Sequence, residues 1–344
     1  MSGHVRHEMR DNTHGIGVGF SNALFDVRET IQYAKLAEAM GFHSVWITED
    51  YFHRSAIPFL TAWATATTRI KVGVGVLPVY TRHLALTAMT MATIDEVSNG
   101  RTILGIGTGD EVIATKNLGI ERKRTISIMR ESIETIRGLT EGKEVTSEGS
   151  FVKMRQVKLT VKPIMGAIPI YLGANQRQML RLAGEVADGV LLTNGTSPEH
   201  VKFATEEVRK GAEKARRDPR SVTIAPYITC AVAKNPNAKL QEDSFLRSFV
   251  AYCLSPSYGD LIAQLSGIDL DVVRSIRKSL EQGRKVEALS LVSSEILEKL
   301  CAVGTPDHLR ERIGQYKKAA CDNCLPIIFP VAGDVRLAVE SAMD

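Results

Sequence analysis

The sequence repeats one pattern eight times: a short apolar run rich in Val and Ile is followed by a longer stretch whose apolar residues have helical spacing. Such runs are typical of buried parallel strands, and such stretches are typical of the helices that cover them. Eight units of this kind close naturally into a (β/α)8 TIM barrel, which predicts an α/β fold. An open, doubly wound sheet is the alternative for the same pattern.

The element boundaries follow from the same pattern. The predicted strands occupy residues 15–20, 44–47, 70–76, 102–106, 168–172, 189–192, 222–232 and 325–329. The predicted helices occupy residues 27–40, 84–97, 123–139 and 177–186, with others beginning near Pro58 and at Ser197–Pro198 and a short one closing the chain. The basic residues 122–124 are predicted to form a solvated helix face.

Two segments interrupt the alternation. Residues 141–160 are predicted to form a hairpin inserted on the surface, and residues 240–302 are predicted to be a helical insertion before the last strand, with no room for a strand. No low-complexity linker and no internal repeat divides the chain. We therefore expect one domain over residues 1–344.

Composition excludes several classes of protein. With 44% hydrophobic and 24% charged residues, the chain is an ordinary globular protein. Its net charge of +4 is weak and spread along the chain, which argues against nucleic acid or an anionic membrane as a partner. No long apolar segment or signal peptide is visible, and none of the five cysteines falls in the first 229 residues, so we expect a cytoplasmic protein.

Metal and redox motifs are weak in this chain. The histidines form no HxH or HExxH pattern, so no metal site is predicted. Cys321 and Cys324 form a lone CxxC before the last strand, on the rim opposite the expected active site. The two tryptophans, Trp46 and Trp63, are expected in the core.

In a TIM barrel, the active site lies at the carboxyl ends of the strands. Glu49 and Asp50 directly follow the second predicted strand. Adjacent carboxylates raise one another's pKa, so the two side chains are candidates for a general acid/base pair. The alternative is that one caps the following loop and the other is simply solvated.

Glycine-rich or small-residue turns end four neighbouring strands. They contain Gly73-Val74-Gly75-Val76, residues 105–110, Gly173-Ala174-Asn175 and residues 193–196. Glycines let a backbone approach a ligand closely, and the helix N-termini that follow such turns attract phosphate. The turns therefore indicate a large, flat, phosphate-bearing cofactor, unless they serve packing alone. The run GIGTGD is not the dinucleotide fingerprint GxGxxG, so a Rossmann site gains little support.

The segments WITEDYF, KVGVGVLPVYTRHLALTAMTMATIDEVSNGR, LGIGTGD, PIYLGANQ and ADGVLLTN occur in this order, and together they resemble the bacterial luciferase-like superfamily. The resemblance covers residues 15–330, and its third-strand segment is the most specific part. It is strongest to the branch that uses the deazaflavin coenzyme F420, which includes methylenetetrahydromethanopterin reductases and glucose-6-phosphate dehydrogenases; other branches use FMN.

The resemblance implies an oxidoreductase that transfers a hydride between F420 and a small organic substrate, for which methylenetetrahydromethanopterin or a related pterin is the candidate. The alternatives are an FMN-dependent monooxygenase and a non-catalytic member of the family. The resemblance also implies a homodimer. Methanogen reductases carry an acidic residue near the end of the first strand, and residues 17–20 have none, which leaves Glu49 as a candidate for proton handling.

The resemblance also assigns cofactor-binding residues. It implies that Asp50 touches the deazaflavin and that a non-prolyl cis peptide between Gly75 and Val76 backs the ring. The full set implied to bind the cofactor is Asp50, Gly73, Val74, Gly75, Val76, Gly107, Thr108, Gly173, Ala174, Asn175 and Thr193. Within this set, Gly107 and Thr108 would contact the side chain of the cofactor. Gly173 to Asn175 and Thr193 would bind its phosphate.

Overall fold

The computed structural model of the protein describes residues 15–149, 151–235, 238–255, 258–321 and 323–343. Eight parallel strands close into a barrel in the order β9-β11-β1-β2-β3-β4-β7-β8 and back to β9, which confirms the predicted TIM barrel. The barrel strands are β1 (Gly17–Phe20), β2 (Ser44–Ile47), β3 (Lys71–Pro78), β4 (Thr102–Gly107), β7 (Ile170–Gly173), β8 (Gly189–Leu192), β9 (Thr223–Val232) and β11 (Ile327–Gly333). The polar N-terminal segment, residues 1–14, lies outside the described residues.

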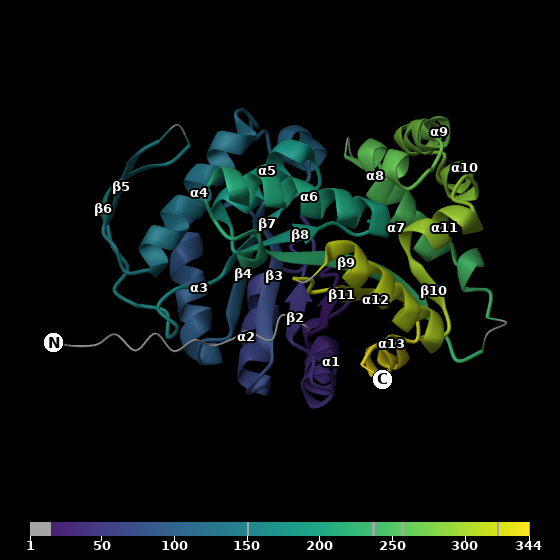
Figure 1. Ribbon diagram of the computed structural model, residues 1–344, viewed down its shortest axis with the longest axis horizontal. Coiled ribbons are helices and arrows are strands. Elements are labelled where there is room, and N and C mark those ends of the chain that lie inside the picture. The colour runs from purple at the N-terminus through teal and green to yellow at the C-terminus, as the bar shows by residue number, and fades with distance from the viewer. Residues whose placement is uncertain (1–14, 150, 236–237, 256–257, 322, 344) are drawn as a thin grey trace.

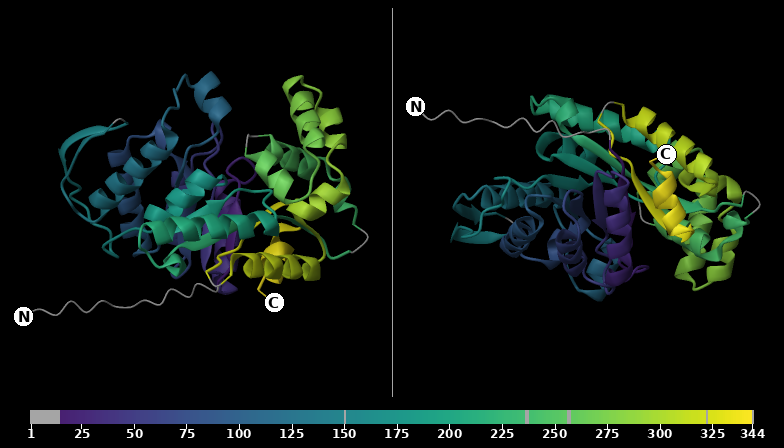
Figure 2. Two further views of the ribbon diagram at one scale, coloured as in Figure 1. Left: turned by 45° about the horizontal axis from the view of Figure 1, so that its top comes forward. Right: turned by 90° about the horizontal axis from the view of Figure 1, so that it is seen from below.

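Helices surround the barrel, as Figures 1 and 2 show. They are α1 (Val27–Ala39), α2 (Ala56–Ala66), α3 (Leu84–Ser98), α4 (Thr125–Thr140), α5 (Arg177–Val186), α6 (Pro198–Lys214), α12 (Pro306–Ala320) and α13 (Val335–Ser341). The predictions omitted α12, which covers the barrel between β9 and β11. No helix among the described residues is both long and apolar enough to cross a membrane.

Side-chain caps explain where most of these helices begin. Asp26, Ser197, Thr305 and Asp334 each accept a backbone N–H from the first turn of α1, α6, α12 and α13, respectively. Such a bond pairs one of the N–H groups that a helix leaves free at its start. Gln176, at the start of α5, makes no such bond. Helices α2 and α4 also begin without a side-chain cap from the residue before them.

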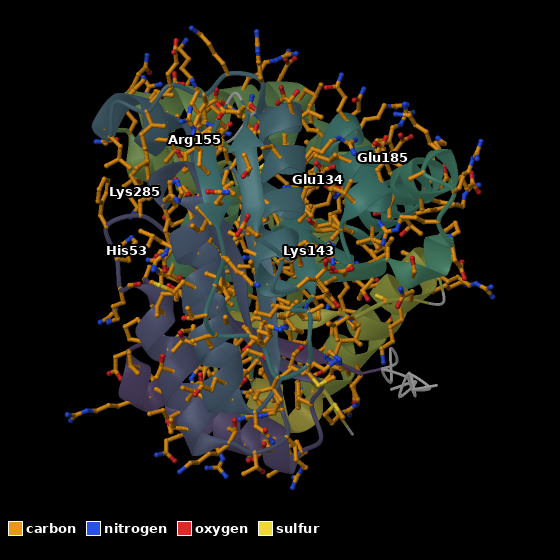
Figure 3. The ribbon with its side chains drawn as sticks, turned by 90° about the vertical axis from the view of Figure 1, so that its left-hand side faces the viewer. His53, Glu134, Lys143, Arg155, Glu185 and Lys285 are labelled. Carbon is orange, nitrogen blue, oxygen red and sulfur yellow. The ribbon has the colours of Figure 1, made fainter. Side chains whose placement is uncertain are left out.

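The predicted surface hairpin is present as β5 (Val145–Glu148) and β6 (Lys153–Val157), paired antiparallel. It is tied to α4, because the Glu131 carboxylate accepts the backbone N–H of Val152 at 3.1 Å. Figure 3 shows this side of the molecule, with Glu134 of α4 and Arg155 of β6 among its charged side chains. In Figures 1 and 2, the hairpin and the helical insertion lie at opposite ends of the molecule.

The insertion consists of α7 (Ser244–Leu254), α8 (Gly259–Leu265), α9 (Leu270–Glu281), α10 (Lys285–Ser290) and α11 (Ser294–Leu300). As predicted, the described part of residues 240–301 is built of helices and contains no strand. The short strand β10 (Ala302–Gly304), which follows α11 and pairs with β9, was not predicted. Strand β9 is ten residues long: β8 pairs with its first half, and β10 pairs with its last three residues. A strand of three residues is too short to show a hydropathy period.

The interior of the barrel is filled by large aromatic side chains. Trp46 packs against Tyr171 with their ring centroids 5.7 Å apart, and Tyr227 packs against Phe329 at 5.2 Å. Phe249 of α7 stacks on Phe329, so the core of the insertion continues the core of the barrel. Trp63 is also fully buried, and the expectation for both tryptophans is confirmed.

Candidate active site

Asp50 lies at the carboxyl end of β2 and is held there by its neighbours. The fully buried Asn22 donates its side-chain amide to the Asp50 carbonyl oxygen at 3.0 Å, and its own Oδ1 accepts the Asp50 N–H at 3.2 Å. The Thr48 hydroxyl donates to the Asp50 carboxylate at 2.8 Å. These bonds fix both the backbone and the carboxyl group of Asp50 at the barrel mouth.

The pKa of Asp50 is raised from the ordinary aspartate value. The largest cause is loss of hydration among the walls of the mouth, even though the side chain stays open to solvent, and the nearby Asp110 adds to the shift. The hydrogen bond from Thr48 and the positive field of His53 oppose it. A raised pKa keeps a larger fraction of Asp50 protonated near neutral pH than in a free aspartic acid, so more of it is available to donate a proton.

Glu49 is turned toward α2. Its carboxylate accepts the backbone N–H of Ala56, the first residue of that helix, where Ser55 makes no side-chain cap. Burial raises the pKa of Glu49, and the hydrogen bond from Ala56 and the field of Arg82 oppose the shift. This contact supports the alternative that one carboxylate of the Glu49–Asp50 pair acts as a cap. A role for Glu49 in proton handling stays a prediction.

Strand β3 bulges where it meets the mouth. The peptide bond between Gly75 and Val76 is cis, as predicted. Val74 lies opposite Leu104, and the next paired residues are Leu77 and Ile106. Over this interval β3 advances by three residues and β4 by two, so β3 carries one extra residue. The Tyr227 hydroxyl donates to the Gly75 carbonyl oxygen at 3.3 Å from across the barrel.

Gly107 and Gly173 make room for the side chain at this bulge. A Cβ on Gly107 would lie 2.5 Å from Cγ2 of Val76, and a Cβ on Gly173 would lie 3.0 Å from Cγ1. Val76 is consequently seated, half-buried, between the ends of β4 and β7. Packing accounts for these two glycines, and their contact with a cofactor stays a prediction.

The turns after β7 and β8 are bound to one another. Oδ1 of Asn175 accepts the backbone N–H of Thr193 at 3.0 Å, and the Ala174 N–H donates to the Leu191 carbonyl oxygen at 3.0 Å. Nε2 of the buried His200 lies 2.9 Å from the Asn175 carbonyl oxygen. These bonds bring together the turn residues predicted to bind phosphate, and α5, with its first turn uncapped by a side chain, begins two residues after Asn175.

The insertion adds polar groups that the sequence reasoning missed. The Tyr252 hydroxyl on α7 donates to Oδ2 of Asp110 at 3.2 Å, and Oδ1 of Asp110 accepts the Ile113 N–H at 2.9 Å. Burial raises the pKa of Tyr258 to about 12, while Thr193 lies close enough to oppose the shift. The position of Asp110 at the end of β4 could be predicted, because it follows the run GIGTG. No sequence pattern predicts that Tyr252 and Tyr258 lie near the mouth.

The family model for luciferase-like monooxygenases matches residues 5–323. The chain belongs to that family. A 5,10-methylenetetrahydromethanopterin reductase of Methanolobus tindarius is 36% identical over 290 residues, which cover 84% of this chain and 86% of the relative. An F420-dependent glucose-6-phosphate dehydrogenase of Mycolicibacterium fortuitum is 28% identical over 315 residues, or 88% of each chain.

Among solved structures of the family, the coenzyme F420-dependent tetrahydromethanopterin reductase of Methanopyrus kandleri aligns with a TM-score of 0.85 and 28% identity. The alignment covers 96% of this chain and 97% of the reductase. The predicted resemblance to the luciferase-like family, and within it to F420-dependent reductases, is therefore confirmed.

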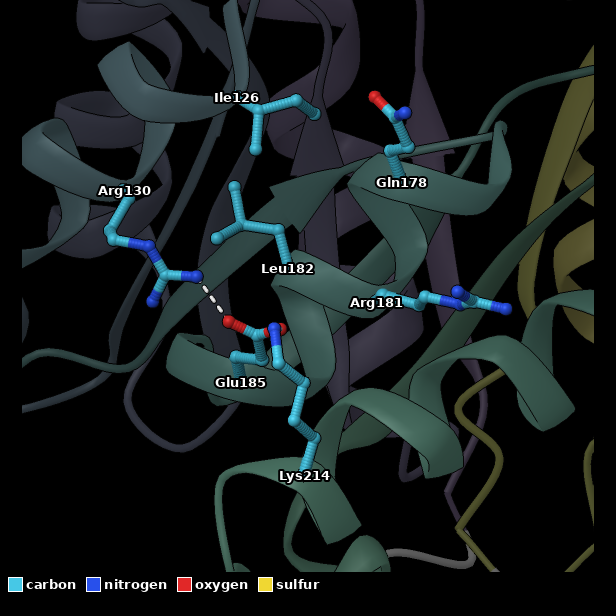
Figure 4. Close-up of a pocket in the computed structure, with 7 residues that line it drawn as sticks. All are labelled: Ile126, Arg130, Gln178, Arg181, Leu182, Glu185 and Lys214. Carbon is cyan, nitrogen blue, oxygen red and sulfur yellow. Dashed lines mark hydrogen bonds and ion pairs between the residues drawn. The ribbon is translucent and has the colours of Figure 1, made fainter.

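Other features of this family member lie away from the mouth. A hollow of about 280 Å³ lies on the outside of the barrel, and Arg130 and Lys214 on its wall both pair with Glu185. Its lining side chains are drawn in Figure 4. Cys321 is exposed at the end of α12 and Cys324 is buried before β11; both are free thiols. Among the described residues, no group of three or more His, Cys, Asp or Glu side chains is arranged to hold a metal ion.

The basic run 122–124 was wrongly predicted to be a helix face. Helix α4 begins only at Thr125, because Arg124 adopts a left-handed conformation with a φ of 51°. Arg122 lies in the preceding loop with its guanidinium 5.6 Å from the centroid of the Tyr80 ring. It therefore belongs to the rim of the mouth.

Proposed function

We propose that the protein is a coenzyme F420-dependent oxidoreductase that reduces 5,10-methylenetetrahydromethanopterin or a related methylene-tetrahydropterin. The observation that carries the proposal is the 36% identity to a reductase of this substrate over 84% of the chain. The match also covers 86% of the relative, which favours a shared reaction over a shared fold alone.

The residues at the mouth fit a cofactor with a flat ring and an anionic side chain. The half-buried Val76 offers an apolar surface at the bulge of β3. The Asn175–Thr193 turns lead into the first turn of α5, whose N–H groups lack a side-chain cap and suit a phosphate. We propose that the predicted cofactor-binding residues, from Asp50 and Gly73 to Thr193, contact F420 in this arrangement.

When bound, F420 supplies the hydride. The residues of the chain position the reactants and handle the proton. Reducing a methylene bridge between two nitrogens breaks one carbon–nitrogen bond, and the released nitrogen takes up a proton. Asp50 is suited to donate it, because its pKa is raised. Asp110 accepts hydrogen bonds from the Ile113 N–H and from the Tyr252 hydroxyl of α7, and these two bonds orient its side chain at the mouth.

The test is a pair of titrations followed by assays. We expect F420 to bind and FMN not to, and we expect reduced F420 to be oxidised on addition of methylenetetrahydromethanopterin. Glucose 6-phosphate and a secondary alcohol are the comparison substrates. Tight binding of FMN without binding of F420 would favour the monooxygenase alternative. Binding of F420 without turnover of any acceptor would favour a non-catalytic role.

We also propose that the protein is a cytoplasmic homodimer without affinity for nucleic acid. Helix α3 exposes a row of apolar side chains, with Leu86 49% exposed, Met89 48% and Val97 42%. Such a row is typical of a surface that another protein covers. Light scattering in solution tests the dimer: Met89→Glu should yield a monomer, and a wild-type protein that is already monomeric would refute it.

A further inference from the structure

Three polar atoms on one side of the mouth are buried without a hydrogen bond among the described residues. They are the hydroxyl oxygens of Tyr51 and Tyr80 and Nε of Arg122. Buried polar groups in folded proteins are nearly always paired, because an unpaired one has lost its water and gained nothing in return. Three such atoms in neighbouring side chains therefore require an explanation.

The three side chains converge on one place. The Arg122 guanidinium lies over the Tyr80 ring, and its Nη1 is 3.5 Å from the Gly109 carbonyl oxygen, at the limit of a hydrogen bond. The Tyr51 hydroxyl lies against the same glycine, since a Cβ on Gly109 would be 2.4 Å from it. Burial raises the pKa of Tyr51, the positive charge of Arg122 and the nearby Thr81 hydroxyl oppose the shift, and Asp110 adds to it. The Thr81 hydroxyl itself donates to the Pro78 carbonyl oxygen at 3.3 Å, and its contact with Tyr51 does not meet hydrogen-bond geometry.

The place adjoins the candidate chemistry. Tyr51 directly follows Asp50, and Gly109 directly precedes Asp110. The side chains come from the segments after β2, β3 and β4, whereas the turns suited to the cofactor phosphate follow β7 and β8. A ligand group held here would thus be separate from that phosphate.

The chemistry of the cluster favours an anion. Arg122 makes no salt bridge within the described part of the chain, although its neighbour Lys123 pairs with Glu121 in solvent. A guanidinium and two tyrosine hydroxyls are all hydrogen-bond donors, and a carboxylate or phosphate accepts from several donors at once. Arg122 is only half-buried, so part of its guanidinium stays accessible.

We propose that Tyr51, Tyr80 and Arg122 form a subsite for a carboxylate or phosphate group of the substrate. The subsite orients the substrate by its anionic end while the reacting carbon lies near Asp50. The identity of the substrate in this inference rests on the proposed function. The preference of the subsite for an anion does not, because it follows from the three side chains.

The experiment compares Arg122→Gln with Lys123→Gln, which removes the same charge from an exposed neighbour. Losing a charge-assisted hydrogen bond in Arg122→Gln should raise KM for methylenetetrahydromethanopterin about tenfold or more. We expect kcat and the dissociation constant of F420, measured by fluorescence, to stay near the wild-type values. Arg122→Lys should restore part of the affinity, and Lys123→Gln should behave as wild type.

Two results would overturn the subsite: an unchanged KM in Arg122→Gln, or a loss of F420 affinity as large as the loss of substrate affinity. The second result would place the anion on the cofactor. If wild-type protein does not turn over the pterin at all, the proposed function fails, and the subsite is judged by binding. Glutarate or inorganic phosphate should then raise the Tm of wild-type protein but not of Arg122→Gln, and no rise in either protein would refute it.

Discussion

The hydroxyl of Tyr252, on the inserted helix α7, donates to Oδ2 of Asp110, in the turn after β4, at 3.2 Å. This bond connects the insertion to the rim of the barrel across the mouth. Because the second oxygen of Asp110 already accepts the Ile113 N–H, the carboxylate is fixed from both sides. The insertion therefore takes part in shaping the site.

Removing this bond should weaken the site without unfolding the protein. In Tyr252→Phe, Asp110 keeps one of its two donors, and an ordinary hydrogen bond is worth about 0.5–1.5 kcal/mol. We expect kcat/KM to fall about tenfold, with Tm nearly unchanged because Tyr252 is half exposed. Steady-state kinetics and thermal melts measure the two effects. Phe245→Leu, at an exposed site on the same helix, is the control and should leave kcat/KM as in wild type.

Asp50→Asn should remove the proposed proton donor while keeping the shape of the side chain. General acid catalysis contributes about 10²–10⁴-fold, so we expect a fall of that order in kcat. In wild type, kcat should decline as pH rises through the raised pKa of Asp50, and this limb should be absent in the variant. An identical pH profile in the two proteins would remove Asp50 from the reaction.

The same pKa shift predicts a difference in stability. A carboxyl group with a raised pKa in the folded state favours folding in its protonated form, and this contribution is lost as pH rises through the folded pKa. Asp50→Asn should therefore melt at a higher temperature than wild type at pH 7. The difference should shrink below about pH 4, where aspartate is protonated in both states. A lower Tm in the variant at pH 7 would contradict this.

Substitution of Glu49 distinguishes a helix-capping role of this residue from a catalytic one. If its carboxylate mainly pairs the Ala56 N–H, Glu49→Ala should lose about 1 kcal/mol of folding free energy, as other helix caps do, and keep kcat within a few fold. Urea denaturation and kinetics give both quantities. A fall in kcat as large as that of Asp50→Asn would instead assign proton handling to Glu49.

Gly107→Ala should displace Val76, because the new Cβ would lie 2.5 Å from its Cγ2. Overpacking of this kind costs about 1–3 kcal/mol, and the shifted side chain should also weaken F420 binding. Adding Val76→Ala should restore stability, since the clashing methyl groups are gone. Gly314→Ala, in α12 with nothing within 4 Å, is the matched control and should not destabilise the protein. Unchanged F420 affinity in Gly107→Ala would separate this glycine from the cofactor site.

The barrel was readable from the sequence because each buried strand has a distinct composition. The predicted bounds of β2 and β8, residues 44–47 and 189–192, match the structure, as do those of α5. Strand β10 was missed because it is too short to show a period. Helix α12 was missed although Thr305 and Pro306 mark its start in the same way that Ser197 and Pro198 mark the start of α6.

Candidate site residues in the turns of the barrel could be predicted from the sequence. Those that depend on contacts between distant parts of the chain could not. Asp50 and the cis peptide at Gly75 follow from strand ends and from resemblance. Tyr252 and Asp110 are 142 residues apart in the sequence. Arg122 contacts Tyr80 because it lies in a loop, since helix α4 begins only at Thr125. No local pattern encodes such contacts.

The most direct measurement of the central claim mixes the protein anaerobically with reduced F420 and methylenetetrahydromethanopterin and follows the fluorescence of oxidised F420. We predict catalytic oxidation of F420 that requires both the protein and the pterin, with methyltetrahydromethanopterin formed in equal amount. No oxidation of reduced F420 by this substrate, together with tight binding of FMN by the protein, would contradict the account.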